Sequence, residues 1–285
     1  MLAQDRDGVK YGHAIKEKYF LLGKDFCNLN HGSFGTTPKP VASAQEKLFL
    51  EQEAHPDNWF RVTYFNYINA TRDLLSKLVK AEADDIVLVE NASSAVNSIL
   101  RTIGLKCGDK VLRLNTAYGM VINTLDWLVD VVGIEVVVVN VHFPVVSSAQ
   151  LVESVSKALN ANPDIKLCIF SHISSMPAMI EPVEQLTELS HKIGAVVLID
   201  GAHAPGEIDI DIPKIGAEFY LGNCHKWLYA PKGTAFLYVK KSLQTPSFPE
   251  PTVISSSGDL TFLVCLLLRY PLIKNFFQNH APHLN

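Results

Sequence analysis

The 285-residue chain lacks the cysteine patterns that stabilise secreted domains or bind structural zinc. Its five cysteines are odd in number, and no two form a C-x-x-C pair. A disulfide framework and a zinc site are therefore both disfavoured. The cysteines are Cys27, Cys107, Cys168, Cys224 and Cys265. Unpaired thiols are typical of a reducing compartment, so we expect a cytoplasmic protein without a metal site.

The chain also lacks an excess of charge and a membrane-length hydrophobic run. Lysine and arginine number 25 against 29 aspartate and glutamate, a net charge of −4, so no nucleic-acid partner is expected. The apolar run LTFLVCLLL at 260–268 is much shorter than the roughly 20 residues that cross a bilayer. The charged first 20 residues do not resemble a secretory signal. With 48% hydrophobic residues, the composition is that of a globular chain away from the membrane.

Two glycine motifs that bind nucleotides are absent as well. The chain contains no G-x-x-x-x-G-K-[ST] loop and no G-x-G-x-x-G turn. A P-loop site and a Rossmann dinucleotide site therefore both lack their signature.

What the sequence does contain is a regular alternation of strands and helices from residue 84 onward. The predicted strands are 84–90, 110–115, 135–141, 165–173, 195–203, 218–226 and 234–240. The predicted helices are 91–104, 117–133, 147–162 and 182–194. The strand runs are almost continuously apolar, as burial under helices on both faces requires. The pattern predicts an α/β domain over 84–245, with a mostly parallel seven-stranded sheet and helices on both faces.

The segments on either side of this domain have different patterns. Residues 1–83 are predicted to form an N-terminal arm with helices at 40–54 and 65–83, separated by an irregular aromatic loop. Before them, 27–40 has glycine and proline but no periodicity, which favours an extended segment that reaches across the domain or to a partner subunit. Residues 246–285 form an atypical tail.

Polar residues cluster where the predicted strands end, which is where open parallel sheets bind ligands. Ser93 and Ser94 open a helix whose first amides could bind an anion, although a plain serine cap would have the same sequence. Asp200 ends the fifth strand. Its carboxylate needs a partner, either a turn N–H or the protonated nitrogen of a pyridine ring.

Lys226 is the most informative of these residues because it follows the strand-like stretch FYLGNCH. A lysine at a strand end is usually solvated, but a desolvated lysine has a lowered pKa and a nucleophilic amine. An aldehyde cofactor with a pyridine ring would engage Lys226 at its aldehyde, Asp200 at its nitrogen and Tyr118 against its ring. A phosphate on the same cofactor would bind Ser93 and Ser94. This combination predicts pyridoxal 5'-phosphate.

Asp200 and Lys226 lie in a stretch that resembles a known family. LIDGAHAPGEIDIDIPKIGAEFYLGNCHKWLYAPKG is similar to the signature of the class V aminotransferases, pyridoxal-phosphate enzymes of fold type I. LNHGSFGTTPKPV, NASSAVNSIL and AYGMVINTL most resemble its isopenicillin N epimerase-like branch, and the resemblance covers about residues 25–245. It implies that Lys226 forms the Schiff base, Asp200 pairs with the pyridinium nitrogen and His203 bonds the phenolic oxygen of the cofactor. The implied cofactor-binding residues are Ser93, Ser94, Tyr118, Ser175, Asp200, His203, Asn223, His225 and Lys226.

The resemblance also implies an activity and an assembly. Asn30 and His31, and less directly Trp59 and Arg61, would reach the pocket of an amino-acid substrate in a homodimer. Lys226 would act as the base at the alpha carbon, with Asp200 and His203 as the other catalytic residues. Return of the proton gives epimerisation, loss of the beta substituent gives elimination, and proton transfer to the cofactor gives transamination. The branch favours a carbon–sulfur lyase or epimerase reaction, and the residues leave the outcome open.

The end of the chain departs from the family pattern. Similarity fades near 255–257, and the remaining residues do not resemble the small C-terminal domain that normally supplies an arginine for the substrate carboxylate. The preferred hypothesis is a truncated or alternatively spliced form, and the alternative is a diverged tail that folds onto the large domain. A catalytically impaired chain that acts as a non-catalytic dimerisation partner is therefore the second functional hypothesis.

Overall fold

A seven-stranded sheet forms the centre of the molecule in the computed structural model, which describes residues 5–145 and 147–244. The strand order is β1-β7-β6-β5-β4-β2-β3. The strands are β1 (Ile86–Val89), β2 (Lys110–Leu114), β3 (Glu135–Val139), β4 (Ile165–Ser171), β5 (Val196–Asp200), β6 (Phe219–Asn223) and β7 (Ala235–Val239). All pairs from β3 to β6 are parallel, and β7 is antiparallel to both of its neighbours. The predicted mostly parallel sheet of seven strands is confirmed.

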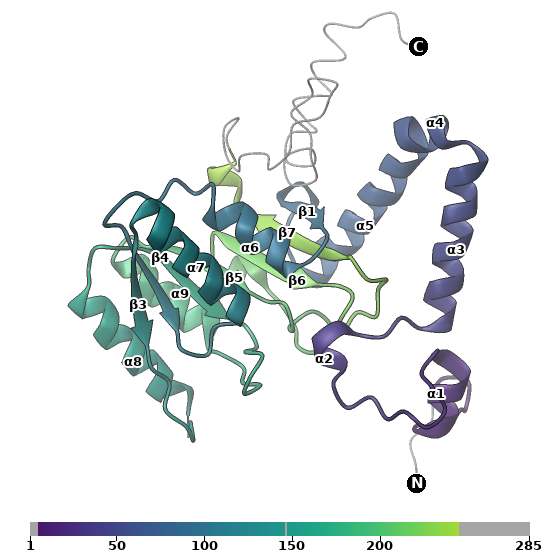
Figure 1. The fold of residues 1–285 in the computed structure, drawn as a ribbon, viewed down its shortest axis with the longest axis horizontal. Coiled ribbons are helices and arrows are strands. Elements are labelled where there is room, and N and C mark those ends of the chain that lie inside the picture. Colours follow the sequence, from purple (N-terminus) through teal and green to yellow (C-terminus); the bar gives the residue numbers. More distant parts are fainter. Residues whose placement is uncertain (1–4, 146, 245–285) are drawn as a thin grey trace, which may run out of the picture.

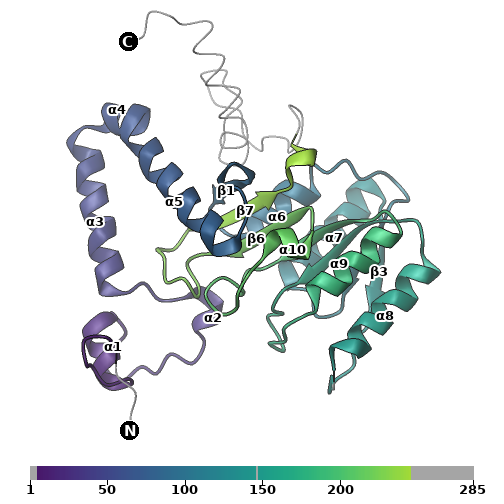
Figure 2. The same ribbon diagram turned by 180° about the vertical axis from the view of Figure 1, so that it is seen from behind.

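Helices cover both faces of the sheet, as the apolar strand pattern requires (Figures 1 and 2). On one face lie α6 (Ala92–Leu100) and α7 (Gly119–Val132), and on the other lie α8 (Ser148–Ala161), α9 (Val183–Lys192) and α10 (Ile212–Ile215). Each face has its own hydrophobic cluster, so the sheet is buried between two cores. Every residue of β6 and β7 is buried.

Several strands end earlier than their apolar runs predict, and β4 is an example. The predicted strand 165–173 ends in the structure at Ser171. The His172 N–H still donates to the Asp200 carbonyl oxygen of β5 at 2.9 Å, and Ile173 then forms an isolated bridge with Ile180 instead. Residues that look like the interior of a strand therefore lie at its end, where ligands bind.

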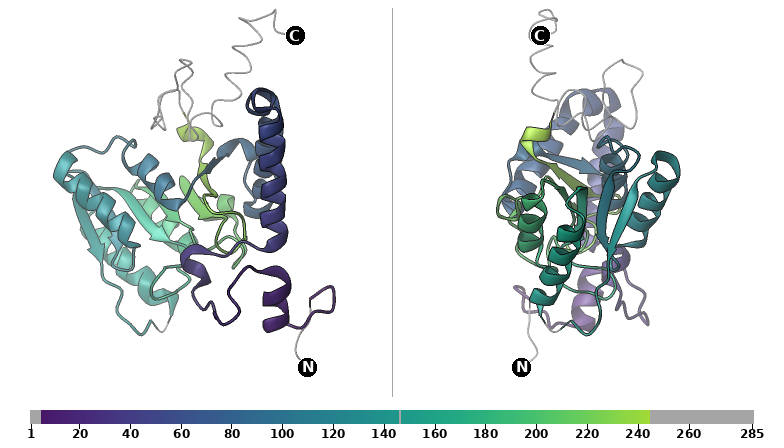
Figure 3. Two further views of the ribbon diagram at one scale, coloured as in Figure 1. Left: turned by 45° about the vertical axis from the view of Figure 1, so that its right-hand side comes forward. Right: turned by 90° about the vertical axis from the view of Figure 1, so that its left-hand side faces the viewer.

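The N-terminal arm consists mainly of a long helical hairpin that stands to one side of the sheet (Figure 3). Its elements are α1 (His13–Tyr19), α2 (His31–Phe34), α3 (Lys39–Ala54), α4 (Pro56–Asn58) and α5 (Tyr64–Val79). The prediction of an irregular loop at 55–62 is wrong, because α4 and a π-helical turn (Trp59–Thr63) continue into α5. The break is confined to His55, whose ring Nδ1 accepts the Asn58 N–H at 3.2 Å and starts the next helix.

The described residues include no helix that is long and apolar enough to cross a membrane. The run 260–268 and the rest of the tail 246–285 lie outside the described residues. The cytoplasmic location and the division into arm, domain and tail stay predictions.

Candidate active site

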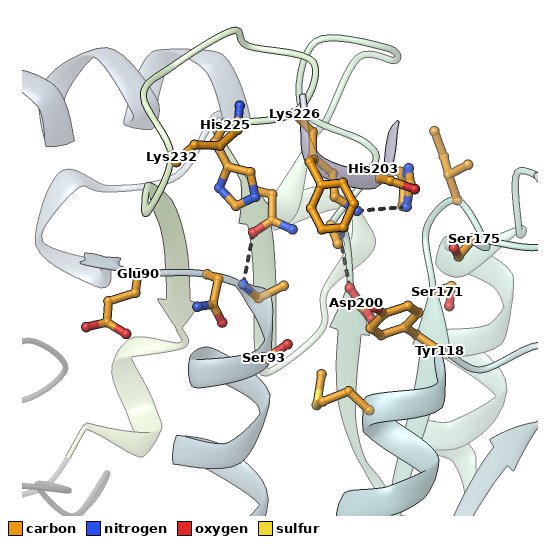
Figure 4. A pocket seen from close by; sticks show the side chains of 18 of the residues that line it. Glu90, Ser93, Tyr118, Ser171, Ser175, Asp200, His203, His225, Lys226 and Lys232 are labelled. Carbon is orange, nitrogen blue, oxygen red and sulfur yellow. Dashed lines mark hydrogen bonds between the residues drawn. The ribbon is translucent and has the colours of Figure 1, made fainter. Parts of the chain in front are cut away.

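The predicted strand ends converge on one cavity of about 330 Å³. It opens at the carboxyl ends of β1, β4, β5 and β6, where an open parallel sheet binds ligands. Figure 4 shows Ser93, His225 and Lys232 toward one end of this cavity. His203, Ser175 and Tyr118 lie toward the other end, and Lys226 and Asp200 lie between. The volume is in the range of small-ligand pockets.

Lys226 and His203 form the central contact of the cavity. Lys226 follows β6 and is 9% exposed, and its Nζ lies 2.9 Å from Nε2 of His203. Burial lowers the pKa of Lys226, while the charge of Asp200 acts against this lowering. Burial and the nearby Lys226 charge lower the pKa of His203 to about 4, so its ring is neutral at pH 7. Nε2 can then accept a proton in a hydrogen bond from the Lys226 amine.

Asp200 places a buried carboxylate on the floor of the same cavity. It ends β5 and is 6% exposed, and its Oδ1 accepts the Ala202 N–H at 3.0 Å. Within the described chain, no hydrogen bond reaches its Oδ2. Burial raises the pKa of Asp200, and the Ala202 N–H and the Lys226 charge oppose that rise. A carboxylate in this setting is stabilised by a cation, which fits a protonated pyridine nitrogen.

The start of α6 forms the end of the cavity that lies opposite His203. Asn223 Oδ1 accepts the Ala92 N–H at 2.9 Å, and Asn91 Oδ1 accepts the Ser94 N–H at 2.8 Å. Between them, the Ser93 N–H has no partner among residues 5–145 and 147–244. A free amide and a hydroxyl at the positive end of a helix dipole suit a phosphate group.

His225 adds a group whose charge responds to an anion. Its Nδ1 lies 2.9 Å from the Thr234 carbonyl oxygen, and because a carbonyl only accepts, Nδ1 is the protonated nitrogen. Burial lowers the pKa of His225. A phosphate beside Nε2 would favour the doubly protonated ring and gain a second donor, since an opposite charge stabilises the cation. Both ends of the cavity therefore fit pyridoxal phosphate.

The structure does not bring every predicted residue to the cavity. Ser94, Asn30 and His31 are not among its lining residues. The Ser94 N–H is already bound by Asn91, and His31 contacts the backbone of Lys226. Trp59 is buried and begins the π-helical turn that follows α4, the helix at the tip of the hairpin in Figure 1. Arg61, in the same turn, is 76% exposed and pairs with Asp57.

Several lining residues had no recognisable signal in the sequence. Ser171 was hidden because the apolar run continues past the true end of β4. Lys232 follows a proline in a turn without periodicity. Ser33 and Phe34 lie two and three positions after His31, so the arm prediction found the segment but not the lining positions. The described part of the chain holds no group of three His, Cys, Asp or Glu side chains suited to a metal ion.

Comparison with known proteins decides the family. The family model described as "Aminotransferase class-V" matches residues 33–258, more than half of the chain. The chain belongs to the class-V aminotransferase family. The family prediction is thus confirmed, and pyridoxal phosphate is the cofactor of this family.

Relatives of this class-V chain include a protein named as a desulfhydrase and one named as a lyase. A probable chloroplastic L-cysteine desulfhydrase of Arabidopsis thaliana is 32% identical over 80% of this chain and 51% of the relative. The hercynylcysteine sulfoxide lyase of Schizosaccharomyces pombe is 31% identical over 80% of this chain and 58% of the relative. The chain therefore spans about half the length of the curated relatives it matches.

A solved structure confirms the fold expected of a class-V chain. It is a mutant of the protein C-DES with glycine covalently linked to its PLP cofactor. It superposes with a TM-score of 0.67 at 17% identity, covering 90% of this chain and 71% of the other. At this identity the likeness shows the α/β fold of the large domain.

Proposed function

We propose that this protein is a pyridoxal-phosphate-dependent lyase that breaks the carbon–sulfur bond of cysteine or a cysteine derivative. The observation that carries the proposal is the buried Lys226 amine, 2.9 Å from a neutral His203 and electrostatically coupled to Asp200. The names of the two relatives support a sulfur-containing amino acid as the substrate.

Each end of the cavity would hold a different part of the cofactor. Lys226 would hold the aldehyde carbon through Nζ, and Asp200 would keep the ring nitrogen protonated. Ser93 and His225 would hold the phosphate at the start of α6. Tyr118, which is 51% exposed and lines the cavity, would cover the ring. The bound cofactor supplies an aldehyde for the substrate amine and a ring that withdraws electrons from the alpha carbon.

The residues of the chain would move the proton. Desolvation favours the neutral amine of Lys226, which can take the proton from the substrate alpha carbon onto Nζ. His203 stays neutral and accepts a hydrogen bond from the resulting ammonium, which keeps Nζ in place. The sulfur leaves the beta carbon with the bonding electron pair. For cysteine, the sum is cysteine plus water giving sulfide, pyruvate and ammonia.

We further propose that the chain acts as a homodimer. The support is the set of large apolar side chains that the hairpin exposes, which include Phe49 at 57%, Leu50 at 60% and Phe60 at 55%. Exposed apolar surface of this kind is typical of protein–protein contacts.

The test is reconstitution of the 285-residue chain with pyridoxal phosphate, followed by absorbance and product assays with cysteine. We expect a cofactor absorbance band, and sulfide and pyruvate in equal amounts. Lys226→Ala should abolish the band and lower turnover by about 10²–10⁴-fold. Lys47→Ala, at an exposed lysine of α3, is the matched control and should change neither.

Other outcomes of this assay decide between the functional hypotheses. Inversion of the alpha carbon without sulfide would replace the lyase by an epimerase. A band that Lys226→Ala abolishes, without any turnover, would favour the non-catalytic partner. A band that survives Lys226→Ala would contradict the site itself.

A further inference from the structure

The arm segment that begins at His31 is docked on the backbone of the proposed catalytic lysine. His31 Nε2 lies 2.8 Å from the carbonyl oxygen of Lys226, although 195 positions separate the two residues. A carbonyl only accepts, so Nε2 carries the proton and donates. The same carbonyl accepts the Tyr229 N–H at 3.2 Å, so His31 adds a second donor to the turn 226–229.

The ring of His31 also packs on the far side of that turn. Its centroid lies 4.8 Å from the ring of Trp227 and 4.6 Å from that of Tyr229. Tyr229 has φ of 58°, a left-handed conformation that a residue with a bulky side chain rarely adopts. A strained backbone conformation of this kind persists where surrounding contacts hold it in place. His31 supplies two such contacts to the turn, the hydrogen bond to the Lys226 carbonyl and the packing of its ring on Tyr229.

The next residue of the arm packs on the other member of the central pair. A Cβ added at Gly32 would lie 3.1 Å from Cε1 and 3.2 Å from Nδ1 of the His203 ring. It would also lie 3.3 Å from the indole of Trp227. The glycine backbone therefore rests against the imidazole, and a methyl group here would push the His203 ring.

The segment is held at its far end as well. A Cβ at Gly35 would lie 1.9 Å from the carbonyl oxygen of His225, and Gly35 has φ of 71°. Its own carbonyl accepts the Lys232 Nζ at 3.1 Å. Only glycine permits this approach, so the arm is seated along the whole turn that carries Lys226.

We propose that His31 and Gly32 are positioning residues for the Lys226–His203 pair. His31 holds the backbone of Lys226, and Gly32 holds the imidazole that contacts its amine. This inference rests on the proposed function, and it gives His31 a different role from the substrate contact that family resemblance implies. The arm residues that line the cavity are Ser33 and Phe34.

The experiment compares two replacements of His31 that remove different parts of its contact. His31→Phe keeps a ring beside Trp227 but loses the donor, whereas His31→Gln keeps an N–H donor. In the reconstituted protein, we expect His31→Phe to shift the apparent pKa of the cofactor absorbance and to lower kcat by about tenfold to a hundredfold, with little change in KM. His31→Gln should restore most of the wild-type kcat and most of the wild-type apparent pKa of the cofactor absorbance. Gly32→Ala should behave like His31→Phe, and His13→Phe, at an exposed histidine of α1, should behave like wild type.

A cofactor-free measurement separates this inference from the proposed function. In ¹⁵N-histidine-labelled protein without added cofactor, His31→Phe and Gly32→Ala should move the His203 signals, assigned with His203→Asn, while the thermal midpoint shows that the variants are folded. If these signals move but no cofactor band forms in wild type, the positioning role stands and the proposed function fails. If folded His31→Phe and Gly32→Ala leave both the His203 signals and the absorbance titration unchanged, the positioning role is wrong. Failure of His31→Gln to restore the titration would also contradict it.

Discussion

The arm and the sheet domain contain similar apolar side chains but bury them very differently. No residue of α3 is buried, whereas every residue of β6 and β7 is. Since burial of apolar surface is the main stabilising contribution to folding, the stability of the described chain resides in the sheet. The hairpin depends on a few attachment points, and one of them is the candidate active site.

Polar contacts at two places, and the buried side chains of Leu75 and Val79 in α5, fix the arm to the sheet domain. At the base of α5, the guanidinium of Arg72 is almost fully buried and donates to the carbonyl oxygens of Ala83 and Ile86. At the other end, α2 and Gly35 are seated against the turn that carries Lys226. The arm therefore has no core of its own, and it is placed by the few core residues of α5 together with polar and shape-specific contacts.

The largest expected effect on stability comes from replacing a phenylalanine by alanine in the sheet domain, compared with the same replacement in the arm. Phe236 in β7 is fully buried and stacks on Tyr220, and Phe49 in α3 is 57% exposed. We expect Phe236→Ala to lower the free energy of unfolding by about 3–5 kcal/mol, and Phe49→Ala to change it by less than about 0.5 kcal/mol. Urea unfolding at a low protein concentration measures both. A similar loss for the two variants would mean that another surface covers α3 in solution.

The next effect concerns the polar attachment at the base of the hairpin. Arg72→Leu removes the charged donor and leaves the carbonyls of Ala83 and Ile86 without it, so we expect a loss of about 3 kcal/mol. Limited proteolysis should then cleave α5 before the sheet domain. Arg72→Lys retains a charge but not the two-carbonyl geometry, and should recover only part of the loss. Unchanged protease resistance would show that the hairpin is held elsewhere.

A smaller, pH-dependent effect is expected from a buried carboxyl group that the proposed chemistry does not use. Glu181 is 2% exposed, and its Oε2 accepts the Ser171 N–H at 3.0 Å. Burial raises the pKa of Glu181 to about 8 from an ordinary value of 4.5. The folded state therefore keeps a proton that the unfolded chain releases between these values, and stability falls as pH rises through this window.

Glu181→Gln tests this because glutamine does not titrate. Relative to wild type, the variant should gain stability from pH 5 to pH 8 and keep a constant advantage above pH 8. Asp57→Asn, at an exposed carboxylate of the arm, should follow the wild-type curve. Parallel curves for wild type and Glu181→Gln would show that Glu181 is not buried as described.

The smallest effect is expected from Arg61, at the far end of the hairpin. Its guanidinium is 76% exposed and pairs with Asp57, and such surface pairs contribute little. We expect Arg61→Ala to change the free energy of unfolding by less than about 0.5 kcal/mol and to leave the proposed lyase activity unchanged. A loss of activity would place Arg61 at the active site of a partner subunit.

The regular part of the fold could be predicted because its signals are local. Continuous apolar strands and amphipathic helices located all seven strands and the four long helices after residue 84. The turn at 55–63 could not be predicted, because a side-chain cap at His55 decides its conformation. At the site, the expectation that ligands bind where parallel strands end identified Lys226 and Asp200. It could not show that Ser93 rather than Ser94 keeps a free backbone N–H.

The amino-acid sequence was enough to predict the order and type of the elements and the residue types available at the ends of the strands. These depend on periodicity and on chemistry within a few residues. The three-dimensional fold was needed to show which of those groups are desolvated and which distant segments meet, such as His31 on the carbonyl of Lys226. pKa shifts and close approach depend on what surrounds a group in space, and a separation of 195 positions along the chain leaves no local record of it.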